Sequence, residues 1–477
     1  MTDRVSDAQL ARRLVIGLAG VWPTAREEAW LRHWQPAGVI LFGRNVTGSD
    51  QLAALCGRLK TLVPGAEICA DHEGGPVSQL AAAVGCPPAA WSLGVLDDAD
   101  LTRRVHAETG RRLFHAGIDR VLAPCADVLS EPRNPVIGSR AFGSDPLLVS
   151  RQVAAAVTGL AQSGVRPCLK HWPGHGGSAQ DSHLQTATTD ALDQDQPFVQ
   201  GLAAGADAVM VGHLQAPDGD LPASLDADRL ARLRRDLGPP GAGSLLLYAD
   251  DVTMGGLRQG MSRLGVTLAD GAGQGMIEPA DLPVAWFAAL AGAGLDRILI
   301  RGIPTGAFPL PAGESPGPAE VAVPAPGFPP VAPEAYTEVC RRLARTLDAD
   351  FAAPDLAVGW VDLTEGDRWE VAGGEGSGER GGFVQELAAR FESVVAPAGE
   401  AAAPTGRALS RLLITSHRPL PPGFDPADRL GSGLAREGIC LVLGHPSLGP
   451  EMEAQLGNGW VVSRWYEVDW GFWGLLS

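Results

Sequence analysis

Short apolar runs recur along the first 300 residues of the chain, and each follows a segment with a helical spacing of apolar positions. The junctions carry a small residue and a glycine, at Ala37-Gly38, Ala116-Gly117, Ser163-Gly164, Ala204-Gly205 and Ala293-Gly294. A glycine in this place commonly ends a helix in the left-handed conformation. Apolar runs that are too short for helices, and that alternate with helices, are typical of buried parallel strands.

Eight such runs precede residue 304, namely LVIGLAG (14–20), VILF (39–42), EICADHEG (67–74), IDRVLAP (118–124), VRPCLK (165–170), ADAVMVGH (206–213), SLLLYADD (244–251) and LDRILI (295–300). Eight strands with intervening helices and right-handed crossovers fit a closed (β/α)8 barrel. The alternative is an open doubly wound sheet, but its fingerprint G-x-G-x-x-G is missing after the first strand. We therefore predict an α/β fold with a TIM-type barrel over residues 1–303 as the catalytic domain.

The remaining third of the chain has a different pattern. Residues 304–333 hold ten prolines and no helical or alternating apolar period, which indicates a proline-rich linker or an extended arm. A helical pattern over residues 334–349 then leads to the apolar runs LAVGWVDL, RLLITS, ICLVLG and WVVSRWYEV. We predict a smaller α/β domain over residues 334–477 and assign it no catalytic residue.

Composition and charge narrow the range of partners. The chain of 477 residues carries 38 Lys and Arg against 55 Asp and Glu, a net charge of −17. This charge repels phosphate backbones and anionic lipid, so we expect neither nucleic acid nor a membrane as a partner. No apolar stretch approaches the roughly 20 residues that span a bilayer, and the first apolar run lacks a clear cleavage site. Seven cysteines stand singly, as in a reducing cell, and we expect a cytoplasmic protein without a cofactor.

Polar residues follow most of the predicted strands. They are Asp71-His72-Glu73 after the third, Asp127 and Arg140 after the fourth, Lys170-His171 after the fifth, His213 after the sixth and Asp250-Asp251 after the seventh. The active site of a parallel barrel lies at the carboxyl ends of its strands. A single polar residue there is ordinarily a loop cap or a surface charge. Five strand ends that converge on one mouth predict a site.

The densest polar segment is KHWPGHGGSAQDSH, from Lys170 to His183. His171 and His175 stand four residues apart, as in a zinc-binding helix, but Pro173 and Gly174 prevent the helical geometry that such a site needs. We therefore expect no metal here and consider acid/base chemistry instead.

Two carboxylates and one imidazole supply that chemistry. Asp181 and His183 are close enough in a turn for the carboxylate to orient the imidazole and raise its basicity, although a helix cap and a loop histidine are the ordinary alternatives. Of Asp250 and Asp251, one is expected to face the mouth and the other to brace the following segment, because successive side chains of a strand face opposite sides. A carboxylate opposite an acid/base residue is the minimum apparatus for retaining glycoside hydrolysis.

These residues stand in blocks that resemble the family 3 glycoside hydrolases, in the branch of β-N-acetylhexosaminidases that act on cell-wall sugars. The family's loop K-H-F-P-G-H-G, followed by D-S-H, stands here from Lys170 to His183 with Trp172 in place of Phe. Further blocks with the usual order are GVILFGRN, DHEGGPV, LAPCADV, NPVIGSRAFGSDP, VMVGHL and YADDVTM.

The resemblance implies that Asp250 is the nucleophile and that His183 is the general acid/base, assisted by Asp181. It implies a retaining exo-glycosidase that releases terminal β-linked N-acetylglucosamine from short glycans or muropeptides through a covalent glycosyl-aspartate. The substrate-binding residues that we infer are Asp71, Arg140, Lys170, His171, His213 and Gln79. Lys and Arg donate hydrogen bonds to hydroxyls while Asp accepts them, which suits a neutral polyhydroxylated ring.

The chain departs from the family at one block. The family writes D-x-E-G-G-R-V-x-R, and Pro76 and Gln79 stand here at the two Arg positions. The amide of Gln79 is shorter than an Arg and uncharged, so substrate preference is expected to change. Two alternatives remain: a β-glucosidase of the same family, which typically lacks the Asp-Ser-His loop, and a catalytically silent sugar-binding protein. An imidazole base also tolerates phosphate as the acceptor, which makes phosphorolysis a side activity to test.

Overall fold

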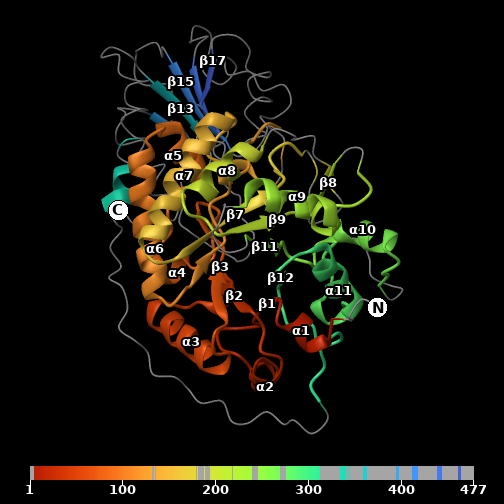
Figure 1. Ribbon diagram of the computed structural model, residues 1–477. Helices are drawn as coiled ribbons and strands as arrows, with labels where there is room; N and C mark the ends of the chain where they lie inside the picture. Colours follow the sequence, from red (N-terminus) through yellow and green to blue (C-terminus); the bar gives the residue numbers. More distant parts are fainter. Residues whose placement is uncertain are drawn as a thin grey trace.

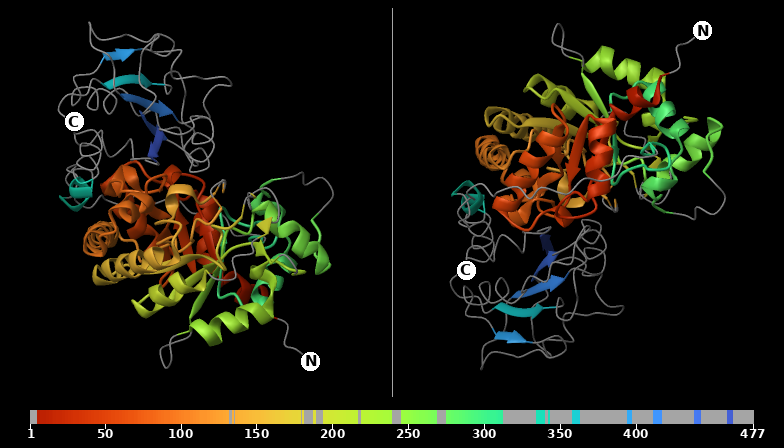
Figure 2. Two further views of the ribbon diagram at one scale, coloured as in Figure 1. Left: turned by 90° about the horizontal axis from the view of Figure 1, so that it is seen from above. Right: turned by 90° about the horizontal axis from the view of Figure 1, so that it is seen from below.

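The computed structural model describes residues 5–131, 134, 136–178, 180, 187–188, 194–216, 219–238, 245–268, 275–311, 334–339 and 342, and five strands between residues 358 and 463. Eight parallel strands form a closed barrel in the order β1-β12-β11-β9-β7-β6-β3-β2. The outer surface of the barrel is covered by helices, as Figures 1 and 2 show. The predicted eight-stranded parallel barrel is confirmed.

A barrel strand overlaps each of the eight apolar runs. The strands are β1 (Leu14–Gly17), β2 (Gly38–Leu41), β3 (Glu67–Ala70), β6 (Arg120–Val121), β7 (Arg166–Trp172), β9 (Ala208–Val211), β11 (Leu246–Ala249) and β12 (Arg297–Ile300). The ring closes where Leu14 of β1 pairs with Ile298 of β12. Two small sheets add to the loops, β4 (His72–Gly74) with β5 (Val77–Ser78) and β8 (Ala187–Thr188) with β10 (Leu214–Gln215).

Several helices begin or end at residues with the expected capping chemistry. The helices of the barrel region are α1 (Asp7–Ala11), α2 (Ala25–Trp34), α3 (Ser49–Leu62), α4 (Ala81–Val84), α5 (Ala90–Leu96), α6 (Ala99–His115), α7 (Pro146–Gln162), α8 (Asp195–Ala203), α9 (Ala227–Leu237), α10 (Arg258–Arg263) and α11 (Val284–Ala293). Thr24 and Glu27 form a capping box at α2, and Pro146 follows the N-cap Asp145 of α7. Gly294 ends α11 with a φ of 113°, as the glycine pattern predicts. No helix in the described ranges is long and apolar enough to span a bilayer.

The core has two layers, as alternation along the strands requires. One layer fills the barrel with side chains that include Val15, Ile40, Leu122, Met210 and Leu299. The other lies between the strands and the helices and includes Leu55, Leu113, Val153, Leu230 and Phe287. Each large apolar side chain buried in this way contributes roughly 1.5–3 kcal/mol to folding.

The amino-terminal end of the barrel holds a buried ionic cluster, which we name the lower cluster and define as Arg120, Glu67, Asp207, Tyr248 and Arg166. The fully buried guanidinium of Arg120 pairs with Glu67 at 3.0 Å and with Asp207 at 2.5 Å. The Tyr248 hydroxyl donates to Glu67, and Arg166 pairs with the same carboxylate. Each carboxylate therefore has a cation of the chain as its partner.

The segments after the barrel are described in part. Residues 304–310 pack on the barrel, where the Trp30 indole donates to the Phe308 carbonyl at 2.8 Å. Residues 334–339 lie on α6, with the buried Tyr336 hydroxyl 2.6 Å from Thr109 Oγ1. Strands β13 (Val358–Asp362), β14 (Val394–Ala396), β15 (Arg411–Ser416), β16 (Gly438–Val442) and β17 (Trp460–Ser463) form a parallel sheet in the order β14-β13-β15-β16-β17. The division at residues 303 and 333 stays a prediction, and most of the proposed linker lies outside the described residues.

Candidate active site

The carboxyl ends of the barrel strands carry the chemistry that the sequence predicts. Asp71 follows β3, Asp127 and Arg140 follow β6, Lys170 and His171 end β7, His213 follows β9 and Asp250 follows β11. Because all these strands are parallel, their carboxyl ends meet at one mouth. The structure thus gathers these residues from distant parts of the chain at one end of the barrel.

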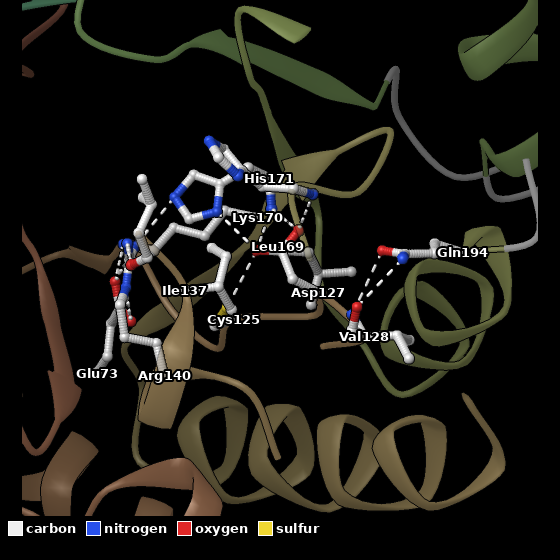
Figure 3. A network of polar contacts seen from close by, with 12 residues as sticks. Glu73, Cys125, Asp127, Val128, Ile137, Arg140, Leu169, Lys170, His171 and Gln194 are labelled. Atoms are coloured by element: carbon white, nitrogen blue, oxygen red, sulfur yellow. Dashed lines mark hydrogen bonds and ion pairs between the residues drawn. The ribbon is translucent and has the colours of Figure 1, made fainter. Parts of the chain in front are cut away.

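Four charged side chains at this mouth alternate in sign, and we name them the upper cluster: Asp71, Lys170, Glu73 and Arg140. The buried Lys170 ammonium lies 2.6 Å from Asp71 Oδ1 and also pairs with Glu73. Arg140 donates two hydrogen bonds to the Glu73 carboxylate, one of 3.0 Å from Nε and one of 2.9 Å from Nη2 (Figure 3). Glu73 therefore joins both cations, and a bidentate guanidinium contact fixes their orientation.

Opposite charges in the upper cluster stabilise the ionised forms of its members. Burial alone would raise the pKa of Glu73, but the charges of Arg140 and Lys170 outweigh it and lower that pKa to about 2. Burial opposes the charge of Lys170, and Asp71 and Glu73 still raise its pKa above the ordinary value. The pKa of Arg140 is raised in the same way, mainly by Glu73 against the effect of burial. Glu73, Lys170 and Arg140 are therefore ionised at neutral pH.

A short hairpin places Glu73 at this position. Glu73 lies in β4, and the turn to β5 passes through Gly74 and Gly75, which have φ angles of 105° and 56°. A Cβ on Gly74 would lie 2.2 Å from the Pro88 carbonyl oxygen, so only glycine fits there. The glycine pair of the DHEGG motif thus serves to present a buried carboxylate.

His171 is oriented by a buried carboxylate on one side and a guanidinium on the other. Its Nδ1 lies 2.7 Å from Asp127 Oδ2, and Arg140 Nη2 lies 3.1 Å from its Nε2. A guanidinium only donates, so a neutral His171 accepts at Nε2 and donates from Nδ1 to Asp127. Asp127 is fully buried and also accepts from the His175 amide at 2.6 Å. Although burial opposes it, this surrounding of donors holds the pKa of Asp127 below its usual range.

Three of the residues at and around His171 could in principle coordinate a metal ion. Within the described residues, Cys125, Asp127 and His171 offer ligand atoms within 4.8 Å of one another. These atoms are already engaged, because Cys125 Sγ donates to Asp127 at 3.1 Å and the His171 ring donates to the same carboxylate. The contacts in this group are hydrogen bonds that orient His171, and we assign no ion to it.

The two adjacent carboxylates after β11 have different tasks. Asp251 is buried, accepts from the Thr253 amide at 3.0 Å and hydroxyl at 2.7 Å, and pairs with Arg301. Asp250 is partly exposed, and its Oδ1 accepts from the Asp251 amide at 2.8 Å. Asp251 is therefore the bracing carboxylate of the predicted pair, and Asp250 is the one that reaches solvent.

Two candidate substrate-binding residues have partners within the protein. His213 is buried, with Nδ1 2.8 Å from Ser224 Oγ and Nε2 3.1 Å from the Asp251 carbonyl. Gln79 Oε1 accepts from the Gly43 amide at 2.8 Å, which joins the β4–β5 hairpin to the turn after β2. Both residues thus support the loops of the mouth, and their contact with substrate stays a prediction.

Asp181 and His183 lie outside the described residues, so the acid/base dyad stays a prediction. The described residues at either end of their segment are held in place. The Trp172 indole donates to Asp195 Oδ1 at 2.9 Å, which joins the end of β7 to the start of α8. The Gln194 amide donates to the Val128 carbonyl at 3.1 Å, as Figure 3 shows.

Sequence reasoning missed the roles of Glu73 and Asp127. Asp127 was noted only as a strand-end residue, and Glu73 only as part of a motif. Charge balance is the signal that finds Glu73: the predicted substrate-binding residues include two cations, Lys170 and Arg140, and one carboxylate, Asp71. Buried charges need partners, so a second acid in the glycine-rich motif was to be expected.

The barrel region is similar in sequence to known proteins. The sequence model of the glycosyl hydrolase family 3 N-terminal domain matches residues 9–276. A β-hexosaminidase of Stenotrophomonas maltophilia strain K279a is 35% identical over 256 residues, which cover 50% of this chain and 75% of that protein.

Solved structures extend the likeness. NagZ from Neisseria gonorrhoeae is 27% identical with a TM-score of 0.52, and the match covers 72% of this chain and 98% of that one. A family 3 β-N-acetylglucosaminidase from Paenibacillus sp. strain FPU-7 has a TM-score of 0.68 and covers 96% of this chain and 93% of its own. At 20% identity, this second likeness is one of fold.

Proposed function

The chain belongs to glycosyl hydrolase family 3, and on that premise we propose that it is a retaining exo-glycosidase that releases terminal β-linked N-acetylglucosamine. It is a glycoside hydrolase of the β-hexosaminidase kind. The observation that carries the proposal is the upper cluster, because its paired donors and acceptors lie at the mouth that also holds the partly exposed carboxylate of Asp250.

Lys170 and Arg140 supply hydrogen-bond donors for hydroxyl groups of the terminal sugar, and Asp71, about a quarter exposed, supplies an acceptor. These groups are fixed by Glu73 before substrate arrives, so little rotamer freedom is lost on binding. The relative from Neisseria gonorrhoeae has been solved with N-trifluoroacetyl-D-glucosamine, an analogue of the sugar that we propose.

In the proposed reaction, the Asp250 carboxylate attacks the anomeric carbon and forms a glycosyl-aspartate while His183 protonates the departing oxygen. His183 then removes a proton from water, which attacks the same carbon and releases the sugar with retained configuration. Asp181 orients the imidazole. The aglycones that we propose are short glycans or muropeptides, and we place the reaction in the cytoplasm.

The test compares chromogenic β-glycosides of N-acetylglucosamine and of glucose. We expect hydrolysis of the first with a kcat/KM at least about tenfold higher, because the pocket should recognise the acetamido group. Equal rates would favour a β-glucosidase, and no turnover of either would favour the silent sugar-binding protein. Assays with added inorganic phosphate, followed by detection of a sugar 1-phosphate, test phosphorolysis as a side activity.

Asp250→Asn removes the nucleophile while it keeps the shape of the side chain. We expect kcat to fall by at least about 10³-fold. A 5-fluoro-N-acetylglucosaminyl fluoride should add one sugar mass to the wild-type protein and none to the variant, as measured by mass spectrometry. A sugar adduct on the variant would place the nucleophile at another residue.

His183→Ala separates the two steps of acid/base catalysis. It should spare glycosylation from substrates with good leaving groups, such as dinitrophenyl glycosides, and should slow substrates with poor leaving groups by about 10²-fold or more. Equal loss on both kinds of substrate would remove His183 from the proposed mechanism.

A further inference from the structure

A chain of polar contacts reaches the Asp250–Asp251 turn from the neighbouring strand ends. Arg301, directly after β12, pairs through Nε with the Asp251 carboxylate. Arg44, in the turn after β2, donates to the Arg301 carbonyl at 2.7 Å and to the Leu18 carbonyl at 2.8 Å. The barrel order β2-β1-β12-β11 makes these four strand ends consecutive. The turn that carries Asp250 is thus tied to three strands beyond its own.

Asp251 is the centre of this arrangement. Its amide donates to Asp250 Oδ1 at 2.8 Å, and its carbonyl lies 3.1 Å from His213 Nε2. Its own carboxylate accepts from Thr253 on Oδ1 and pairs with Arg301 on Oδ2. The position of the Asp250 carboxylate therefore depends on where the Asp251 backbone and carboxylate are held.

We propose that Arg301 is a positioning residue for hydrolysis, which holds the nucleophile Asp250 through the buried carboxylate of Asp251. The inference rests on the proposed role of Asp250 as nucleophile. The Arg301 side chain is 43% exposed, whereas that of Asp251 is 4% exposed. An ion pair between two exposed groups contributes little, but an Arg that neutralises a buried carboxylate prevents an uncompensated charge.

The charge state of Asp251 gives the arrangement a measurable signature. Burial raises the pKa of Asp251, and Arg301 acts against that rise. The other charged groups that face Asp251 are Arg44, from the turn after β2, and Asp250 on its own turn. The His213 ring contacts the backbone carbonyl of Asp251. Without Arg301, the Asp251 carboxyl should therefore take up a proton at a higher pH.

The experiment compares Arg301→Met and Arg301→Lys in the full chain with the matched control Arg166→Met. Arg166 is 51% exposed and pairs with Glu67, which is 8% exposed, so the control removes a similar ion pair at the opposite end of the barrel. For Arg301→Met, we expect kcat on a chromogenic N-acetylglucosaminide to fall by about 10-fold to 100-fold, while KM changes less than about twofold. The acid limb of the kcat/KM profile should move to higher pH, and Arg301→Lys should restore most of kcat and of the profile.

A second readout does not depend on turnover. A carboxyl group whose pKa is raised in the folded state destabilises that state as pH rises through the folded pKa. The difference in unfolding free energy between Arg301→Met and wild type should therefore shrink as pH falls, and Arg166→Met should show no such trend. If Arg301→Met does not fold, the Arg301→Lys profiles decide.

Two outcomes overturn the inference. One is an Arg301→Met enzyme whose kcat and pH profile match those of Arg166→Met. The other is a stability difference that does not change with pH. If the wild-type chain does not hydrolyse the glycoside, the proposed function fails instead, and the stability measurement still decides whether Arg301 holds Asp251.

Discussion

The two ends of the barrel each hold an ionic cluster around a buried cation, and the two clusters differ in where they meet solvent. In the lower cluster, Glu67 takes contacts from Arg120, Arg166 and Tyr248, and the Tyr248 ring lies below the Arg120 guanidinium at 5.5 Å. In the upper cluster, the series of alternating charges ends at Asp71, whose side chain is 23% exposed. Each cluster also has a partly exposed carboxylate, which is Asp207 at the amino end of the barrel in the lower cluster and Asp71 at the mouth in the upper cluster.

This difference shows how similar pairs of charges serve two purposes. Buried ion pairs contribute little net stability, but loss of one partner strands the other charge at a cost of about 3–5 kcal/mol. At the amino end, the paired carboxylates compensate the buried charge of Arg120 inside the barrel. At the carboxyl end, the pairing fixes Lys170 and Arg140 in place through Glu73 and leaves Asp71 at the mouth for a hydroxyl group.

The largest effect is expected from the same substitution in each cluster. Glu73→Gln and Glu67→Gln each leave buried cations without a full counter-charge, and each should lower the unfolding free energy by about 3–5 kcal/mol in urea titrations. Only Glu73→Gln should also lower kcat, by about 10²-fold, because Lys170 and Arg140 lose their common partner. An equal loss of kcat in Glu67→Gln, assayed where both variants are folded, would contradict the claim that only the upper cluster serves catalysis.

A smaller effect per residue is expected on acidification. Burial lowers the pKa of both His72 and His175 to about 4, and both lie in segments of the upper end. Each is neutral when folded and binds a proton on unfolding between pH about 6.5 and about 4. The folded state should therefore lose up to about 3 kcal/mol per histidine as pH falls through that window.

Hydrogen exchange locates this loss. Amides of residues 71–79 and 171–178 should lose protection before those of β11 as pH falls from about 6.5 to about 4. His72→Gln should flatten the pH dependence of the unfolding free energy. Loss of protection at the same pH in all strands would contradict the expected order of the two ends.

The smallest effect on stability is expected at the outermost carboxylate of each cluster. Asp71→Asn and Asp207→Asn change side chains that are 23% and 47% exposed, so each should cost about 1 kcal/mol or less in thermal unfolding. Asp71→Asn alone should lower kcat/KM by about tenfold, because the proposed acceptor for a sugar hydroxyl is weakened. Unchanged kcat/KM in Asp71→Asn would remove Asp71 from the binding site.

The barrel could be predicted from the sequence because its signal is local and repeated. A strand overlaps each apolar run, although β6 covers only Arg120–Val121 of a longer run, since Pro124 has no amide hydrogen to donate. The small strands β4, β5, β8 and β10 were not predicted, because two or three residues carry no period. Phe308 lies in the proline-rich segment but is fully buried, a result of contacts with Trp34 and Phe287 that composition does not reveal.

The site could be predicted as far as strand ends determine it. Asp71, Lys170 and Asp250 follow buried runs, so their place at the mouth comes directly from the fold. The role of Glu73 depends on two cations that come from other strands, and one partner of His213 is Ser224, which lies in a 3-10 turn after β10. Such contacts depend on how separate loops pack together, which no single stretch of sequence records.

The indole contact between Trp172 and Asp195 has a consequence for protein engineering. Asp181 and His183 lie between these two residues in the sequence, so the contact joins the two ends of the segment that carries the proposed dyad. The ends of that segment are thus kept together by the scaffold, so a replacement of different length pays only a small, slowly growing entropic cost of closure. Segments from related enzymes should be exchangeable as cassettes between these two anchor residues where they keep the contacts of His175 with Asp127 and of Gln194 with Val128.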